Sequence, residues 1–80
     1  MIERRRYPRF RADEPARILV DSRFVLACTI RDISLGGACL DVDSPLGIPD
    51  AFDLIPSNSD GHACRVMWRG KDRVGVAFQY

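Results

Sequence analysis

The sequence predicts an all-β domain, a small six-stranded antiparallel β-barrel, on three observations. Apolar and polar residues alternate with a period of two along most of the chain, which is typical of half-buried strands. Clusters of Gly, Pro, Asp, Asn and Ser interrupt this alternation at intervals of about ten residues, as in small barrels and sandwiches. The chain has 80 residues, enough for one compact domain, and closing a small sheet into a barrel removes its exposed edges.

Six segments fit the strand pattern, at residues 16–21, 24–33, 38–43, 52–56, 62–69 and 73–80. No segment has a convincing helical period. The side chains expected to point inward are mostly of medium size: Ile18, Val20, Leu26, Cys28, Ile30, Ala38, Leu40, Val42, Cys64, Val66, Trp68, Val74, Val76 and Phe78. Because such side chains fill a barrel of this size, a ligand site is expected on its outside.

Positive charge is concentrated at the N-terminus. Residues 1–11 hold five arginines and one glutamate, a net charge of +4, whereas the other 69 residues hold seven basic and ten acidic side chains, a net charge of −3. Pro8 disfavours a regular helix through this segment. We therefore expect a flexible arginine-rich arm over residues 1–15 and a barrel over residues 16–80, together forming one domain.

Composition argues against several classes of protein. The chain has no apolar run of about 18 residues, so no membrane span is expected, and no apolar segment follows its N-terminal charges as in a signal peptide. Cys28, Cys39 and Cys64 are odd in number and form no CxxC pair, which indicates free thiols in a reducing, cytoplasmic compartment and argues against a metal site. No nucleophile and base lie at a recognisable catalytic spacing, so we expect no catalytic residues and no enzyme activity.

The first motif is Arg-Arg-Arg-Tyr-Pro-Arg at residues 4–9, which contains the spacing RxxxR as Arg5 and Arg9. On an extended arm, these guanidinium groups can close over a flat anionic ligand, because arginine presents a planar fork of donors to phosphate and can stack on a base. The alternative is a basic tail that keeps the protein soluble or contacts nucleic acid non-specifically.

The second motif is DxSxxG, formed by Asp32, Ser34 and Gly37. Within a strand, Asp32 and Ser34 share a face because the side-chain period is two. The aspartate can accept the paired N–H donors of a guanine edge or hold an arginine in place, and the serine can donate to a phosphate or a base. Gly36 and Gly37 allow positive φ and a close approach of the backbone to a ligand. The alternative is an ordinary hairpin turn whose Asp and Ser satisfy local backbone groups.

The two motifs, in this order and separated by 22 residues, resemble the PilZ domain family. The resemblance covers essentially the whole chain and extends to Cys-Arg-Val-Met-Trp-Arg and Arg-Val-Gly-Val-Ala-Phe near its end, which are similar to the last hairpin of that family. It implies a six-stranded antiparallel barrel that binds the bacterial second messenger cyclic di-GMP at one outer edge. By this resemblance, Arg5 and Arg9 grip phosphate and guanine from the arm. Asp32 and Ser34 read guanine and help to fix the arm, and Gly37 gives the turn.

The resemblance also implies a receptor that needs no cofactor. In this family an arginine just before RxxxR, here Arg4, favours an intercalated dimer of the ligand. We expect the arm to order on binding and so to change the surface that is offered to an unidentified partner protein. No specific nucleic acid is expected as a partner.

Two other functions stay open. A PilZ-like domain can serve as a protein-interaction module that binds no nucleotide, although degenerate motifs would be expected there and both are intact here. A small barrel with an arginine arm and exposed aromatic residues can bind RNA. The net negative charge of the barrel body and the expected core positions of most aromatic residues argue against RNA.

Overall fold

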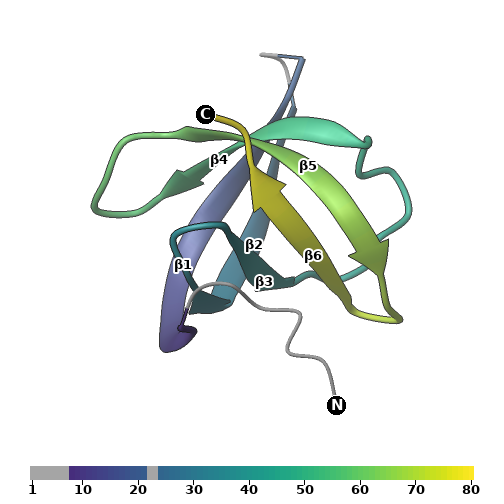
Figure 1. Cartoon of the computed structure of the whole chain (residues 1–80). Helices are drawn as coiled ribbons and strands as arrows, with labels where there is room; N and C mark the ends of the chain where they lie inside the picture. The colour runs from purple at the N-terminus through teal and green to yellow at the C-terminus, as the bar shows by residue number, and fades with distance from the viewer. Residues whose placement is uncertain (1–7, 22–23) are drawn as a thin grey trace.

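The computed structural model describes residues 8–21 and 24–80, which form a closed barrel of six antiparallel strands (Figure 1). The strands are β1 (Phe10–Val20), β2 (Phe24–Ile33), β3 (Gly37–Asp41), β4 (Ala51–Pro56), β5 (His62–Arg69) and β6 (Arg73–Phe78). Around the barrel their order is β1-β2-β3-β6-β5-β4, and β4 closes the barrel by pairing with β1. The predicted all-β, six-stranded antiparallel barrel is confirmed. In the described part of the chain, no helix is long and apolar enough to cross a membrane.

The first strand is longer than predicted. β1 begins at Phe10, six residues before the expected start. Phe10, Arg11, Glu14 and Pro15 pair with β2, although the sequence assigns them to the arm. A β-bulge between Arg11 and Glu14 shifts the register there, and Asp13 within it has a φ of 48°. The less exposed positions of this half still alternate, but they hold Ala12 and Glu14 and no large apolar side chain, so the apolar–polar alternation that marks a strand is missing from the sequence.

The core fills the inside of the barrel. Its fully buried members include Ile18, Ile30, Leu40, Leu54 and Val74, one from each of five strands. Most of the side chains predicted to point inward are buried in this cluster. The core also contains four residues that the strand pattern does not predict to point inward: Ala16, Ile48, Phe52 and Leu54.

The prediction that Trp68 points into the core is wrong. Its side chain is 48% exposed. The register of β5 against β6 shifts between Val66, which pairs with Val76, and Trp68, which pairs with Gly75. The shift marks a β-bulge, and a slip of one residue moves a side chain to the other face of the sheet. Trp68 therefore lies on the outside of the barrel.

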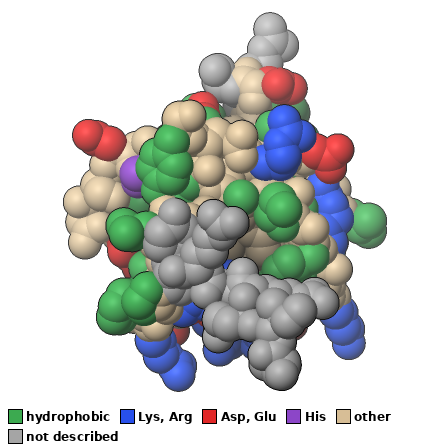
Figure 2. All heavy atoms as spheres, in the orientation of Figure 1, with side chains coloured by type: hydrophobic (Ala, Val, Ile, Leu, Met, Phe, Trp, Pro, Cys, Tyr) green, Lys and Arg blue, Asp and Glu red, His purple; other side chains and the backbone are tan. Residues whose placement is uncertain are grey.

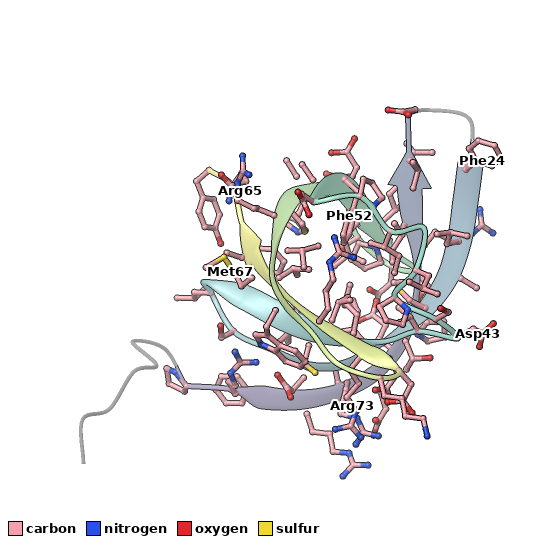
Figure 3. The ribbon with its side chains drawn as sticks, turned by 90° about the vertical axis from the view of Figure 1, so that its right-hand side faces the viewer. Phe24, Asp43, Phe52, Arg65, Met67 and Arg73 are labelled. Atoms are coloured by element: carbon pink, nitrogen blue, oxygen red, sulfur yellow. The ribbon has the colours of Figure 1, made fainter. Side chains whose placement is uncertain are left out.

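The β1–β2 hairpin extends beyond the barrel, at the top of Figure 1. β2 pairs with β3 only from Thr29 to Ile33, so among the described residues Phe24–Cys28 pair with β1 alone. Leu26 pairs with Ile18 and so faces the inner side of the sheet, as predicted, but it lies beyond the part of β2 that pairs with β3 and is 38% exposed. Phe24, at the end of the hairpin in Figure 3, and Val25 are more exposed still.

Candidate functional site

The DxSxxG motif forms the tight turn between β2 and β3. The backbone N–H of Ser34 donates to the carbonyl of Gly37 at 2.8 Å, and the hydroxyl of Ser34 accepts from the N–H groups of Gly36 and Gly37, both at 3.2 Å. The prediction that Asp32 and Ser34 share a strand face is wrong, because β2 ends at Ile33 and Ser34 lies in the turn. Its oxygen shapes the turn, as in the local alternative.

The turn needs glycine at positions 36 and 37 for a reason that the sequence does not indicate. Gly36 and Gly37 allow positive φ, but neither uses it, since Gly47 is the only glycine with positive φ among the described residues. A Cβ on Gly37 would lie 2.1 Å from the backbone oxygen of Val76 in β6. The carbonyl of Gly36 accepts the N–H of Phe78 at 2.9 Å. The glycine pair therefore lets the turn lie directly against the backbone of β6.

Arg9 and Asp32 join the two motifs. A terminal guanidinium nitrogen of Arg9 lies 2.5 Å from a carboxylate oxygen of Asp32. The contact follows from the strand register, since Phe10 pairs with Ile33 and Arg11 with Asp32. The side chains of Arg9 and Asp32 are 28% and 29% exposed, so their ion pair is partly shielded from water. Arg4 and Arg5 lie outside the described residues.

Asp32 begins a row of residues that crosses the outer face of the barrel. Asp32 pairs with Cys39, Cys39 with Gly75, and Gly75 with Trp68, on strands β2, β3, β6 and β5. Directly paired residues point to the same face of a sheet. A Cβ on Gly75 would lie 2.0 Å from the indole nitrogen of Trp68, so the indole covers the glycine. An exposed aromatic ring thus lies on the same surface as Asp32.

Sequence reasoning missed Trp68 as a site residue. One signal was available: Gly75 interrupts an otherwise apolar strand, and a glycine inside a strand often marks the close approach of another group. Cys39 between them is buried although it faces outward. Burial, followed by the charge of Asp32, raises the pKa of the Cys39 thiol, so this thiol stays protonated at neutral pH.

The C-terminal residues hold the turn from the other side. The hydroxyl of Tyr80 donates to the carbonyl oxygen of Leu35. The ring of Tyr80 packs edge-on against Phe78, which in turn stacks on His62 with ring centroids 5.1 Å apart. These contacts connect β5 and β6 to the turn that carries the second motif.

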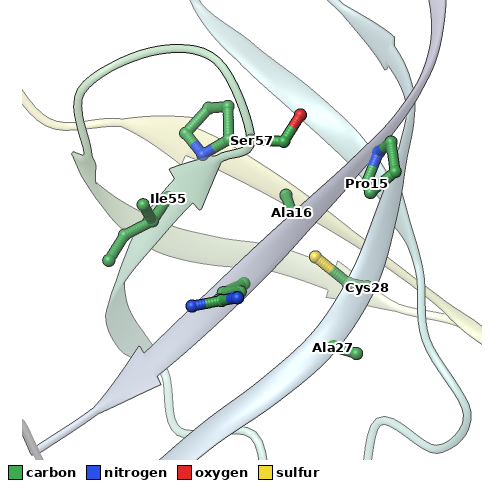
Figure 4. Close-up of a pocket in the computed structure, with 8 residues that line it drawn as sticks. Pro15, Ala16, Ala27, Cys28, Ile55 and Ser57 are labelled. Atoms are coloured by element: carbon green, nitrogen blue, oxygen red, sulfur yellow. The ribbon is translucent and has the colours of Figure 1, made fainter.

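A cavity of about 460 Å³ lies elsewhere, between β1, β2 and β4 (Figure 4). Its lining is mainly apolar and includes Pro15, Ala16, Cys28 and Ile55, but none of the predicted site residues. Burial raises the pKa of the Cys28 thiol to about 11, so it is not a reactive nucleophile at neutral pH. The outer face between Asp32 and Trp68 is therefore the stronger candidate site.

Comparison with known protein families agrees with this interpretation of the motifs. The family model of the PilZ domain matches residues 3–80. A search of curated proteins finds no match.

Proposed function

The chain belongs to the PilZ domain family, a family of cyclic di-GMP receptors, and from this premise we propose that it binds cyclic di-GMP on the outer face between Asp32 and Trp68. PilZ domains are binding domains and not enzymes. The observation that carries the proposal is the Arg9–Asp32 ion pair, because it brings the arginine motif of the arm to the DxSxxG turn. A cyclic dinucleotide offers the phosphates and guanine bases that these two groups recognise.

The proposed roles follow from the chemistry of each side chain. Arg5 and Arg9 contact phosphate and the guanine base, and Arg4 supplies further positive charge for a second, intercalated ligand molecule. Asp32 accepts from the N–H groups of a guanine edge while it holds Arg9. Ser34, Gly36 and Gly37 act by fixing the turn, since the serine oxygen already accepts two backbone N–H groups.

Trp68 gives the face a stacking platform. Its ring is exposed, rests on Gly75, and belongs to the same cross-strand row as Asp32. Stacking of a base on an aromatic side chain contributes about 1–3 kcal/mol. We therefore place one guanine of the ligand on the indole.

Calorimetric titration of cyclic di-GMP into the purified protein tests this proposal. We expect binding by the wild type, and a loss of affinity of about tenfold or more for Arg5→Ala and Asp32→Ala, because each removes a charge-assisted hydrogen bond. Trp68→Ala is expected to lose about fivefold to a hundredfold. Arg17→Ala, which removes an exposed arginine from β1 beside the cavity and away from the Asp32–Trp68 row, is the control and should bind like the wild type.

No heat from the wild type at tens of micromolar would exclude the proposed receptor function. A single-stranded RNA, titrated at two salt concentrations, tests the rival function. Contacts to RNA phosphates weaken steeply as salt increases. If RNA binds and cyclic di-GMP does not, the function of the arginine arm is to bind nucleic acid.

Signal output is proposed to depend on the N-terminal segment. Arg9 is held at the start of the barrel by Asp32, and the remaining arginines of the first motif precede it. Ligand phosphates would draw residues 1–7 onto the outer face and change the surface that a partner protein meets. The three cysteines of the chain are free thiols, which supports a reducing, cytoplasmic location for this receptor.

Hydrogen exchange with and without ligand tests this coupling. We expect the amides of residues 1–7 to gain protection when cyclic di-GMP is bound, while those of β4 stay unchanged as an internal control. Ordering a segment costs conformational entropy, which the phosphate contacts must exceed. Equal exchange of residues 1–7 in both states would contradict the proposed role of the arm.

A further inference from the structure

A second group of charged side chains lies beside the candidate site. Arg31 of β2 donates from Nε to both carboxylate oxygens of Asp41 in β3, at 3.2 and 3.1 Å. Arg73 of β6 donates from its own Nε to one of the same oxygens, at 3.0 Å. The three side chains are between 35% and 45% exposed, so a ligand in solution can reach them.

Strand register explains why these residues meet. Asp41 pairs directly with Arg73 across β3 and β6. The register of β2 against β3 shifts between Ile30, which pairs with Leu40, and Asp32, which pairs with Cys39, so Arg31 is the extra residue of a bulge. The bulge sends Arg31 and Asp32 to the same outer face, whereas regular alternation would separate them.

The group retains a net positive charge. Two guanidinium groups share one carboxylate, and both use Nε for it, so their terminal nitrogens have no partner among the described residues. The hydrogen bond to Asp41 raises the pKa of Arg31 above its ordinary value, which keeps it charged. Asp41 thus lowers the total charge but holds both guanidinium groups in place, which reduces the entropy lost when they bind an anion.

Its position links the group to the candidate site. Asp41 lies two residues after Cys39 on β3, and Arg73 two residues before Gly75 on β6, so the group is displaced from the Asp32–Trp68 row by about 7 Å. A Cβ on Gly70 would lie 3.5 Å from the indole of Trp68 and 3.9 Å from the Cβ of Arg73, so Arg73 branches from the sheet near the indole. Figure 2 shows basic side chains along the lower edge of the barrel, where β1 begins and β5 turns into β6.

We infer that Arg31 and Arg73 form a second phosphate subsite, which binds a phosphodiester of a nucleotide held on the Asp32–Trp68 row. This inference rests on the proposed function. The phosphate belongs either to the same cyclic dinucleotide or to a second molecule stacked on the first. Arg31 and Arg73 supply the donors, and Asp41 is a positioning residue.

The matched variants are Arg31→Gln/Arg73→Gln and Arg17→Gln/Arg65→Gln. Each pair removes two positive charges from exposed strand positions, and Arg17 and Arg65 lie on β1 and β5. Arg65 pairs with Ala77, which pairs with Gly37, so it also faces outward but lies on the opposite side of the Asp32–Trp68 row from Arg73 (Figure 3). It therefore controls for the loss of a positive charge near the row. In calorimetric titration with cyclic di-GMP, we expect the first pair to bind at least about tenfold more weakly than the second. A stoichiometry that falls from two to one assigns the phosphate to a second ligand molecule, and an unchanged stoichiometry assigns it to the same molecule.

Equal affinity and stoichiometry of the two double variants would overturn the subsite while leaving the receptor function intact. If the wild type does not bind cyclic di-GMP, the receptor function itself fails, and pyrophosphate is then used as the probe of the subsite. NMR signals of the arginine Nε–H groups should shift for Arg31 and Arg73 and stay unchanged for Arg17 and Arg65. In the pyrophosphate titration, equal shifts of all four arginine Nε–H signals would overturn the subsite. Thermal unfolding of each variant verifies that it is folded.

Discussion

Gly37 and Gly75 illustrate two different uses of a missing side chain. A Cβ on Gly37 would meet the backbone of Val76, with 2.1 Å to its oxygen and 3.1 Å to its carbonyl carbon. A Cβ on Gly75 would instead meet the side chain of Trp68. The first glycine lets two backbones approach, and the second makes room for an aromatic ring on the outer face.

Replacing Gly37 tests the first of these uses. We expect Gly37→Ala to lower the free energy of unfolding by about 2–3 kcal/mol or more, because the strand pairing of β3 with β6 must separate to admit the methyl group. Urea denaturation provides the measurement. Gly47→Ala is the control, since Gly47 has open space around it but a φ of 86°, and about 1 kcal/mol is expected there. Equal losses would mean that the close approach to β6 is not what requires glycine.

At the scale of the elements, bulges decide which side chains form the site. The sequence predicts the bounds of β2 and β5 correctly, because their alternation of apolar and polar residues is regular enough to mark a strand. The same alternation predicts the wrong face for Trp68, since one extra residue in β5 reverses the orientation of the side chains after it. The start of β1 is missed for another reason, because its inner positions hold Ala12 and Glu14 and no large apolar side chain.

The motifs themselves are visible in the sequence, but their geometry is not. RxxxR and DxSxxG are 22 residues apart, and only the pairing of β1 with β2 brings Arg9 to Asp32. Hydrogen bonding of Ser34 within its turn is one of the two alternatives that the sequence leaves open. The ligand roles of Arg4, Arg5, Arg9, Asp32, Ser34, Gly36 and Gly37 stay predictions that the titrations decide.

Among the described residues, the edge of β2 over Phe24–Cys28 that faces away from β1 has no strand partner, so it is open to unwanted pairing. Phe24–Cys28 carry no charge, and Val25 is 55% exposed. Natural sheets protect such edges with lysine or proline. We expect Val25→Lys to change the free energy of unfolding by less than about 0.5 kcal/mol and to lower self-association at high concentration, as measured by light scattering. Val25→Thr, which keeps a β-branched side chain without charge, is the control, and equal self-association of the two variants would contradict the expectation.

At the scale of the whole molecule, the barrel interior excludes charge. Among the described residues no polar or charged residue is buried. The core contains the thiols of Cys28 and Cys64, and burial raises the pKa of each from 9.0 to about 11. Folding therefore favours the protonated thiols.

This preference makes stability depend on pH at the alkaline end. Below pH 9.0 both thiols are protonated whether the chain is folded or unfolded, so their contribution to stability is complete there. This contribution is lost as pH rises from 9.0 to about 11, because the unfolded chain releases its thiol protons first. The free energy of unfolding of the wild type should thus fall over this window more than that of Cys28→Ala/Cys64→Ala. Urea titrations at several pH values measure both. Parallel curves would show that the thiols do not titrate differently in the two states.

Trp68 is the sole tryptophan of the chain, and the structure places it on the candidate face. Its fluorescence therefore comes from one known point on the barrel, and a base stacked on the indole changes that emission directly. Binding to this face can be followed on the natural protein without a label. The same signal separates two locations of a ligand, since a molecule bound in the cavity between β1, β2 and β4 leaves the indole uncovered.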